Sequence, residues 1–68
     1  MREEVTVEYY GGPLSINLVG AVKVPAGRAN ENAKAVGKLL CKVNHTNELQ
    51  AILIDQEGDE VERMMVYR

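Results

Sequence analysis

The fold is decided by residues 24–44, which read VPAGRANENAKAVGKLLCKVN. Before this stretch the apolar residues alternate with a period of two, and within it they recur at helical spacing. The apolar positions fall at steps of four, three, four and three: Ala29, Ala33, Val36, Leu40 and Val43. The sequence therefore predicts one amphipathic helix that starts between Gly27 and Asn30 and ends near Asn44.

Leu39 and Gly37 widen the apolar arc of the predicted helix. A glycine inside a helix costs roughly 1 kcal/mol relative to alanine. We therefore expect that the missing side chain serves close contact between the helix and the sheet.

Two strands are predicted before the helix. Residues 5–10 alternate apolar and polar side chains, and Gly11-Gly12-Pro13 supplies a tight turn. Residues 14–24 then alternate again, with Gly20 in an inward position that is typical of a bulge or a close backbone approach. The first part of the chain therefore predicts a hairpin with a long second strand.

A second hairpin is predicted after the helix. Residues 49–55 and 61–67 are strongly apolar, and the turn Gln56-Glu57-Gly58-Asp59 separates them. Gly58 is suited to a left-handed backbone position in that turn.

The predicted fold class is therefore α+β with the order β-β-α-β-β. It consists of a four-stranded, mainly antiparallel sheet with one helix packed on one face, and residues 1–68 form a single small domain. If the sheet is antiparallel throughout, the strand order is 2-1-3-4 or 1-2-4-3. Antiparallel pairing is favoured because the chain is dominated by hairpins.

Composition excludes several classes of protein. The 68 residues contain 8 Lys and Arg against 10 Asp and Glu, a net charge of −2, which excludes a strongly basic nucleic-acid-coating protein. With 46% hydrophobic and 26% charged residues, the chain is not expected to be disordered. No apolar run reaches the ~18 residues of a membrane span. Because no signal peptide is apparent and Cys41 has no second cysteine to pair with, we expect a cytoplasmic protein.

The titratable residues do not predict an enzyme. Cys41 and His45 stand four residues apart, but we expect Cys41 at the margin of the helix and His45 in a polar loop, with nothing to orient either. One cysteine and one histidine cannot supply the four ligands of a structural zinc site. The acidic segment 55–60 is too short for a calcium-binding loop. The sequence thus predicts no catalytic residue, no metal and no cofactor.

The second hairpin is apolar on both faces, although one helix can cover only one face of the sheet. We expect one apolar set to remain exposed, and assign it to Ile52, Ile54, Met64 and Val66. A large exposed apolar patch usually marks an interaction surface. A partner would also add stability that a core of this size lacks. These residues therefore predict a homodimer, or binding to another protein.

The tip of the second hairpin is acidic, with carboxylates at Glu57, Asp59, Glu60 and Glu62. Small acidic α+β chains can occupy basic grooves of other proteins, as some phage-encoded inhibitors do, which is an analogy of class alone. The predicted function is a small non-catalytic protein-interaction module, binding or inhibitory, that uses the apolar sheet face and the acidic tip.

The alternative function is association with nucleic acid. Lys34, Lys38 and Lys42 recur every four residues on the outer face of the predicted helix, and Arg28 precedes it. Such a ridge can follow phosphates, although the negative net charge and a solvated helix face both argue against it.

Overall fold

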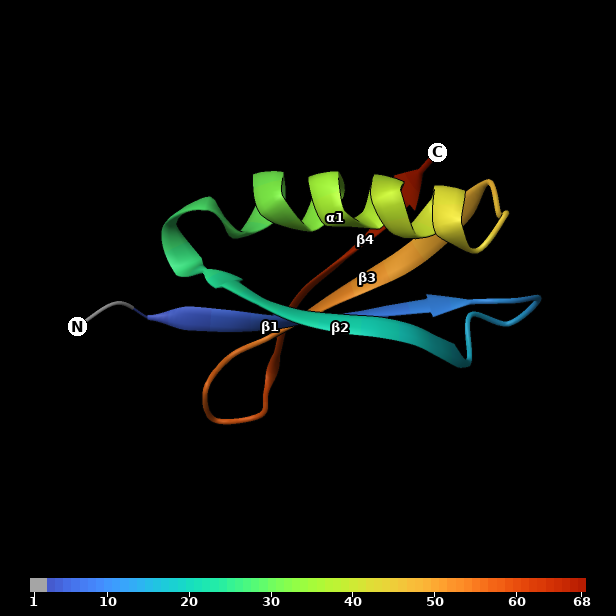
Figure 1. Ribbon diagram of the computed structural model, residues 1–68. Helices are drawn as coiled ribbons and strands as arrows, with labels where there is room; N and C mark the ends of the chain where they lie inside the picture. Colours follow the sequence, from blue (N-terminus) through green and yellow to red (C-terminus); the bar gives the residue numbers. More distant parts are fainter. Residues whose placement is uncertain (1–2) are drawn as a thin grey trace.

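The computed structural model describes residues 3–68. It contains four strands, a short 3-10 turn and one helix: β1 (Glu4–Gly11), β2 (Asn17–Pro25), η1 (Ala26–Arg28), α1 (Ala29–Val43), β3 (Glu48–Ile54) and β4 (Glu60–Tyr67). The strands form one antiparallel sheet in the order β2-β1-β3-β4, and α1 lies across one face of it (Figure 1). The predicted fold class, element order and helix bounds are confirmed, and one of the two predicted strand orders is observed.

The core lies between the sheet and α1. Buried residues alternate along β1 and β3, as a half-covered antiparallel sheet requires. The buried apolar side chains are Val5, Val7, Tyr9, Val24, Leu49, Ala51, Leu53 and Val66 from the sheet, and Ala29, Ala33 and Cys41 from the helix. The other face of the sheet is called the open face below.

Part of the predicted stripe is confirmed: Ala29 and Ala33 are buried, and Val36 and Leu40 pack against the core. The buried positions of α1 are Ala29, Ala33, Gly37 and Cys41, at steps of four, whereas Val43 is 73% exposed. Leu39, which is 62% exposed, also lies outside the core, so the prediction that Val43 and Leu39 face the core is wrong. Small residues at the four buried positions leave little side-chain volume between α1 and the sheet.

Gly37 is the point of closest approach. A Cβ atom at this position would lie 2.6 Å from Cγ1 of Val66 and 3.0 Å from its Cβ, which is too close for two carbon atoms. The expectation that Gly37 allows the helix to contact the sheet closely is confirmed.

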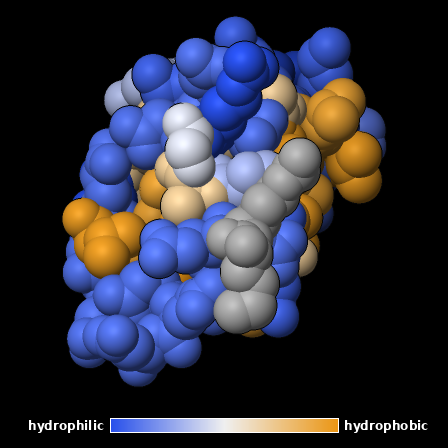
Figure 2. Space-filling model, turned by 90° about the vertical axis from the view of Figure 1, so that its left-hand side faces the viewer, coloured by the Kyte–Doolittle hydropathy of each residue, from blue (hydrophilic) through white to orange (hydrophobic). Residues whose placement is uncertain are grey.

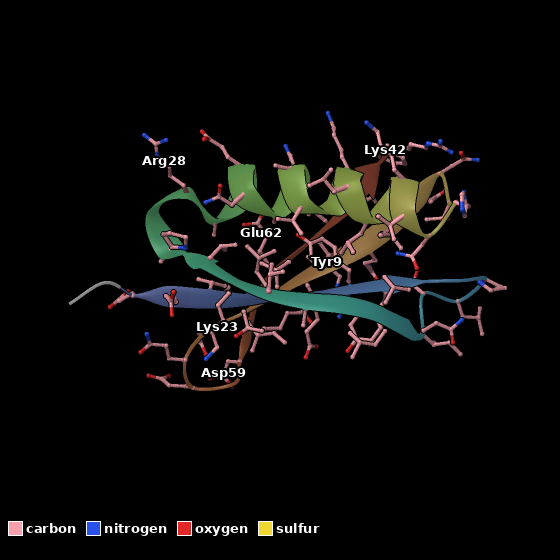
Figure 3. The ribbon with its side chains drawn as sticks, viewed as in Figure 1. Tyr9, Lys23, Arg28, Lys42, Asp59 and Glu62 are labelled. Carbon is pink, nitrogen blue, oxygen red and sulfur yellow. The ribbon has the colours of Figure 1, made fainter. Side chains whose placement is uncertain are left out.

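Tyr9 connects the sheet to the helix backbone. Its side chain is fully buried beneath α1, and its hydroxyl donates a hydrogen bond of 2.5 Å to the carbonyl oxygen of Ala33 (Figure 3). Burial raises the pKa of Tyr9 to about 12. Tyr9 is the one aromatic ring in the core formed by residues 3–68, and its polar end is satisfied.

Cys41 is fully buried, so the prediction that it lies at the margin of the helix is wrong. Its Sγ lies 3.8 Å from the carbonyl oxygen of Val66, and burial raises the pKa of the thiol. Because a thiolate is the nucleophilic form, burial of this thiol disfavours its reactive state. His45 is exposed beyond the helix, with a left-handed φ of 53°.

The two hairpin turns place a glycine at a left-handed backbone position, as predicted, but β2 is shorter than predicted. Gly12 and Gly58 have positive φ angles of 90° and 89°, as a left-handed turn position requires. However, β2 begins only at Asn17, so Leu14 and Ile16 lie in the turn before it and are 77% and 68% exposed. The predicted strand over residues 14–24 was therefore too long at its start.

Gly20 has both features that its position predicted. The register between β1 and β2 shifts between Tyr9 and Tyr10, which leaves Val19 as an extra residue next to Gly20. A Cβ atom on Gly20 would lie 3.2 Å from Cδ1 of Leu40 in α1. The bulge and the close approach of the helix thus occur together.

Candidate binding surfaces

The open face carries apolar side chains across all four strands. Residues that pair across an antiparallel sheet share a face, so the register defines this surface. Its apolar members are Leu18, Tyr10, Ile52, Ile54, Met65 and Tyr67. Leu18 and Tyr67 are 57% and 61% exposed, and the two isoleucines are half-buried among their neighbours. Charged side chains, including Glu8 and Arg63, pair with Ile52 on its two sides.

Two of the predicted surface residues belong to the opposite face. Met64 pairs with buried Ala51, and Val66 pairs with buried Leu49, so both point toward α1. The prediction that they share a face with Ile52 and Ile54 is wrong. Both faces of β4 are apolar, so alternation alone cannot assign its phase, which the contact between Val66 and Gly37 fixes. Met65 occupies the open face instead.

The four residues of the predicted acidic tip lie in three different environments. Glu57 and Asp59 are exposed at the β3–β4 turn. Glu60 forms a 2.6 Å ion pair with Arg63, and this hydrogen bond lowers the pKa of the Glu60 carboxyl. Glu62 lies on the helix side of the sheet, where its Oε2 accepts a 3.3 Å hydrogen bond from Nδ2 of Asn30 (Figure 3).

The structure adds two acidic residues that sequence reasoning missed. Glu3 and Glu4 line a cavity of about 230 Å³ together with Asp55 and Glu57. Antiparallel pairing of β1 with β3 brings the start of the first strand beside the end of the third. Figure 2 views the molecule from this end, and its surface there is mostly hydrophilic. We call Glu3, Glu4, Asp55, Glu57 and Asp59 the acidic end.

Asp55 organises the turn within the acidic end. Carboxylate oxygens of Asp55, Glu57 and Asp59 lie within 4.8 Å of one another, a spacing that could hold a cation. One oxygen of Asp55 already accepts hydrogen bonds from the backbone N–H groups of Glu57 and Asp59, both at 2.9 Å. The turn itself therefore accounts for the grouping, and the absence of a metal stays a prediction.

Asp55→Ala should lower the free energy of unfolding by about 1–3 kcal/mol, because it removes a charged acceptor from two backbone donors. Asp55→Asn keeps an acceptor oxygen and should lose less. In urea denaturation, the midpoint concentration should fall in the order wild type, Asp55→Asn, Asp55→Ala, while the slope of the unfolding free energy against urea stays constant. Equal midpoints for the alanine variant and the wild type would contradict this role for Asp55.

The lysine ridge, which consists of Lys34, Lys38 and Lys42, is exposed on α1. Lys34 and Lys38 line an open groove of about 470 Å³ beside β4, together with Met65, Val66, Tyr67 and Arg68. Arg28 and Lys42 lie at opposite ends of the helix (Figure 3). The structure thus adds Tyr67 and Arg68 to the basic surface and separates Arg28 from it.

Comparison with known proteins identifies no relative. No family model, curated protein or solved structure matches the chain. No helix within residues 3–68 has the length and apolar character needed to cross a membrane. The chain is a small α+β protein with one helix on a four-stranded sheet, and its function is inferred from its surfaces alone.

Proposed function

We propose that the chain is a non-catalytic protein-binding module whose binding surface is the open face of the sheet. The observation that carries this proposal is the set of apolar side chains on that face, over which no other element of residues 3–68 lies. These apolar side chains are interspersed with Glu8, Gln50 and Arg63, and exposed apolar surface that alternates with polar groups is typical of protein interaction sites. The module acts in the cytoplasm, because a single thiol suits a reducing compartment.

The acidic end extends this surface and indicates the chemistry of the partner. Ile54 on the open face is followed directly by Asp55, so the apolar and acidic regions are continuous. A partner with an apolar patch bordered by basic side chains would complement both. Opposite charges of this kind mainly increase the association rate and the specificity. An inhibitor that fills a basic groove is one form that such a module could take.

Affinity capture with matched variants tests the proposal. A protein recovered on the immobilised wild-type chain is purified and titrated against the variants by calorimetry. Ile52→Gln/Ile54→Gln should weaken binding at least tenfold, about 1.4 kcal/mol, and Lys34→Gln/Lys38→Gln should not. If the captured protein binds the isoleucine variant as tightly as the wild type, and circular dichroism shows that the variant is folded, binding through the open face is contradicted.

A second candidate, nucleic-acid binding, is favoured by the groove beside β4. Lys34, Lys38 and Arg68 line it together with Tyr67, and a tyrosine ring is a side chain on which bases can stack. The net charge of −2 opposes this function.

Replacing Lys34, Lys38 and Lys42 together by Gln separates the two functions. Stability should change little, because exposed charges each contribute little. If the groove binds nucleic acid, the affinity should fall and the dependence of log K on log salt should weaken by up to about three units. A native chain that is not retained on DNA or heparin at low salt would eliminate this candidate.

A further inference from the structure

One long side of the molecule combines an unpaired strand edge with an apolar side of the helix. β2 is the last strand of the sheet, so one row of its backbone N–H and C=O groups has no strand beside it. This strand is nine residues long and reads NLVGAVKVP, with Lys23 as its single charged residue. Long apolar edges of this kind pair readily with other strands.

The helix is apolar above the same edge. Leu40 packs against Gly20 of β2, which identifies the side of α1 that overhangs this strand. Val36, Leu39 and Val43 lie three or four residues from Leu40 or from one another and therefore continue that side. Leu39 and Val43 are 62% and 73% exposed, although both are large and apolar. We call the β2 edge together with Val36, Leu39, Leu40 and Val43 the β2 flank.

We propose that the β2 flank binds a second copy of this chain. In the resulting two-fold dimer, β2 pairs antiparallel with the same strand of the other copy, and one sheet continues through both. The two helices then pack side by side through Leu39 and Val43. This surface differs from the open face, so each copy keeps the proposed partner-binding surface accessible.

The charge distribution favours a second copy as the occupant. The helical part of the flank has no charged side chain, and Lys23 points to the open face because it pairs with Thr6. Two copies can therefore meet without like charges in contact, whereas a charged partner would leave its own charges unpaired. The other edge strand, β4, carries Glu60, Glu62 and Arg63, which discourage pairing there.

The dimensions of the flank set the size of the contact in such a dimer. At ~3.3 Å per residue, β2 is about 30 Å long, and the helix above it adds a width of about 10 Å. A standard interface buries about 800 Å² per partner, roughly a sixth of the 4732 Å² surface of the chain. The apolar helix side spans only the eight residues from Val36 to Val43, about 12 Å, so the contact is smaller than this standard size and backbone pairing along β2 supplies most of it.

Sedimentation equilibrium with Leu39→Glu/Val43→Glu tests the dimer. The wild type should be dimeric at about 100 μM, with a melting temperature that rises with concentration. The glutamate variant should dissociate at least 100-fold more readily, because four like charges would meet across the two-fold axis. Its fold should be unchanged in the monomer, since both side chains are already exposed there. Ile52→Gln/Ile54→Gln, the matched control on the open face, should remain dimeric.

Hydrogen exchange of the wild type gives a second measurement that does not depend on variants. Amides along the outer edge of β2 should become more protected as the concentration rises, while those on the outer edge of β4 should not. A monomeric wild type at about 100 μM would overturn the proposal. So would a dimer that persists in the glutamate variant, or one lost only in the open-face variant. Because partner binding is measured on the open face, the two proposals can fail separately.

Discussion

Gly37→Leu should abolish the folded state or lower its stability by more than about 3 kcal/mol, the largest effect expected for one added side chain. Even Gly37→Ala should destabilise by about 1–3 kcal/mol, although alanine is the better helix former. The cause is Val66, whose Cγ1 atom lies 2.6 Å from the position of the new Cβ. Val66 is branched at Cβ and buried in a strand, so it cannot rotate away freely. Thermal and urea denaturation measure both effects.

Two further variants separate steric overlap from helix propensity. Ala35→Gly, at an exposed position of the same helix, should cost roughly 1 kcal/mol from propensity alone. In the double variant Gly37→Ala/Val66→Ala, removal of the valine methyls should make the total loss smaller than the sum of the single losses. Additive losses, or a Gly37→Ala variant more stable than wild type, would show that the helix does not approach the sheet this closely.

Tyr9→Ala should cost about 3–5 kcal/mol, because it removes the largest buried side chain and leaves a cavity beneath the helix. Tyr9→Phe keeps the ring and should cost about 1 kcal/mol for the lost hydrogen bond to Ala33. The order wild type, Phe, Ala in urea midpoints checks both values. A phenylalanine variant as damaging as the alanine variant would mean that the hydroxyl, not the ring, holds this contact.

Alkaline pH gives an independent measure of the same contact. The pKa of Tyr9 is raised by burial from 10.0 to about 12, so the folded chain holds this proton to higher pH than the unfolded chain. The resulting stability is fully present below pH 10 and is lost as the pH rises toward 12. The total loss should be roughly 2–3 kcal/mol, since each pKa unit corresponds to 1.36 kcal/mol. Tyr9→Phe should remove this part of the pH dependence.

Tyr10 provides the control for this experiment. Its hydroxyl donates a 2.9 Å hydrogen bond to Glu8 on the open face, and this bond raises the pKa of Tyr10 as well. The Tyr10 side chain lies outside the core, so Tyr10→Phe should leave most of the loss of stability at alkaline pH unchanged. If the Tyr10 variant removes the loss and the Tyr9 variant does not, the assignment of the buried proton to Tyr9 is wrong.

The fold was predictable where the signal in the sequence is local. The change of period after Pro25, the turn glycines Gly12 and Gly58, and the helical spacing over 29–43 each depend on a few neighbouring residues. Gly37 was also informative, because a glycine in the middle of a helix costs stability and therefore implies a reason for its presence. These features were enough to determine the order and type of the elements.

The rotation of the helix and the phase of the last strand were not predictable in this way. Val43 and Cys41 exchange their expected environments because the fully buried positions of the helix carry small residues, while Val36 and Leu40 are only partly buried beside them. Met64 and Met65 are neighbours of the same type, so the alternation of β4 fits either face equally well. The acidic end depends on which strands lie side by side, and sequence reasoning left two strand orders open.

The pairing of β1 with β3 has a consequence for how the chain folds. Each hairpin joins strands that are close in sequence, but Thr6 meets Ile54 only after β2 and α1 are spanned. Closing so long a loop costs entropy before its contacts are made, and contacts between distant residues slow folding. The two hairpins should therefore form early, and the pairing of β1 with β3 should form late. Until these two strands pair, both expose apolar edges, and folding at high chain concentration competes with aggregation at those edges.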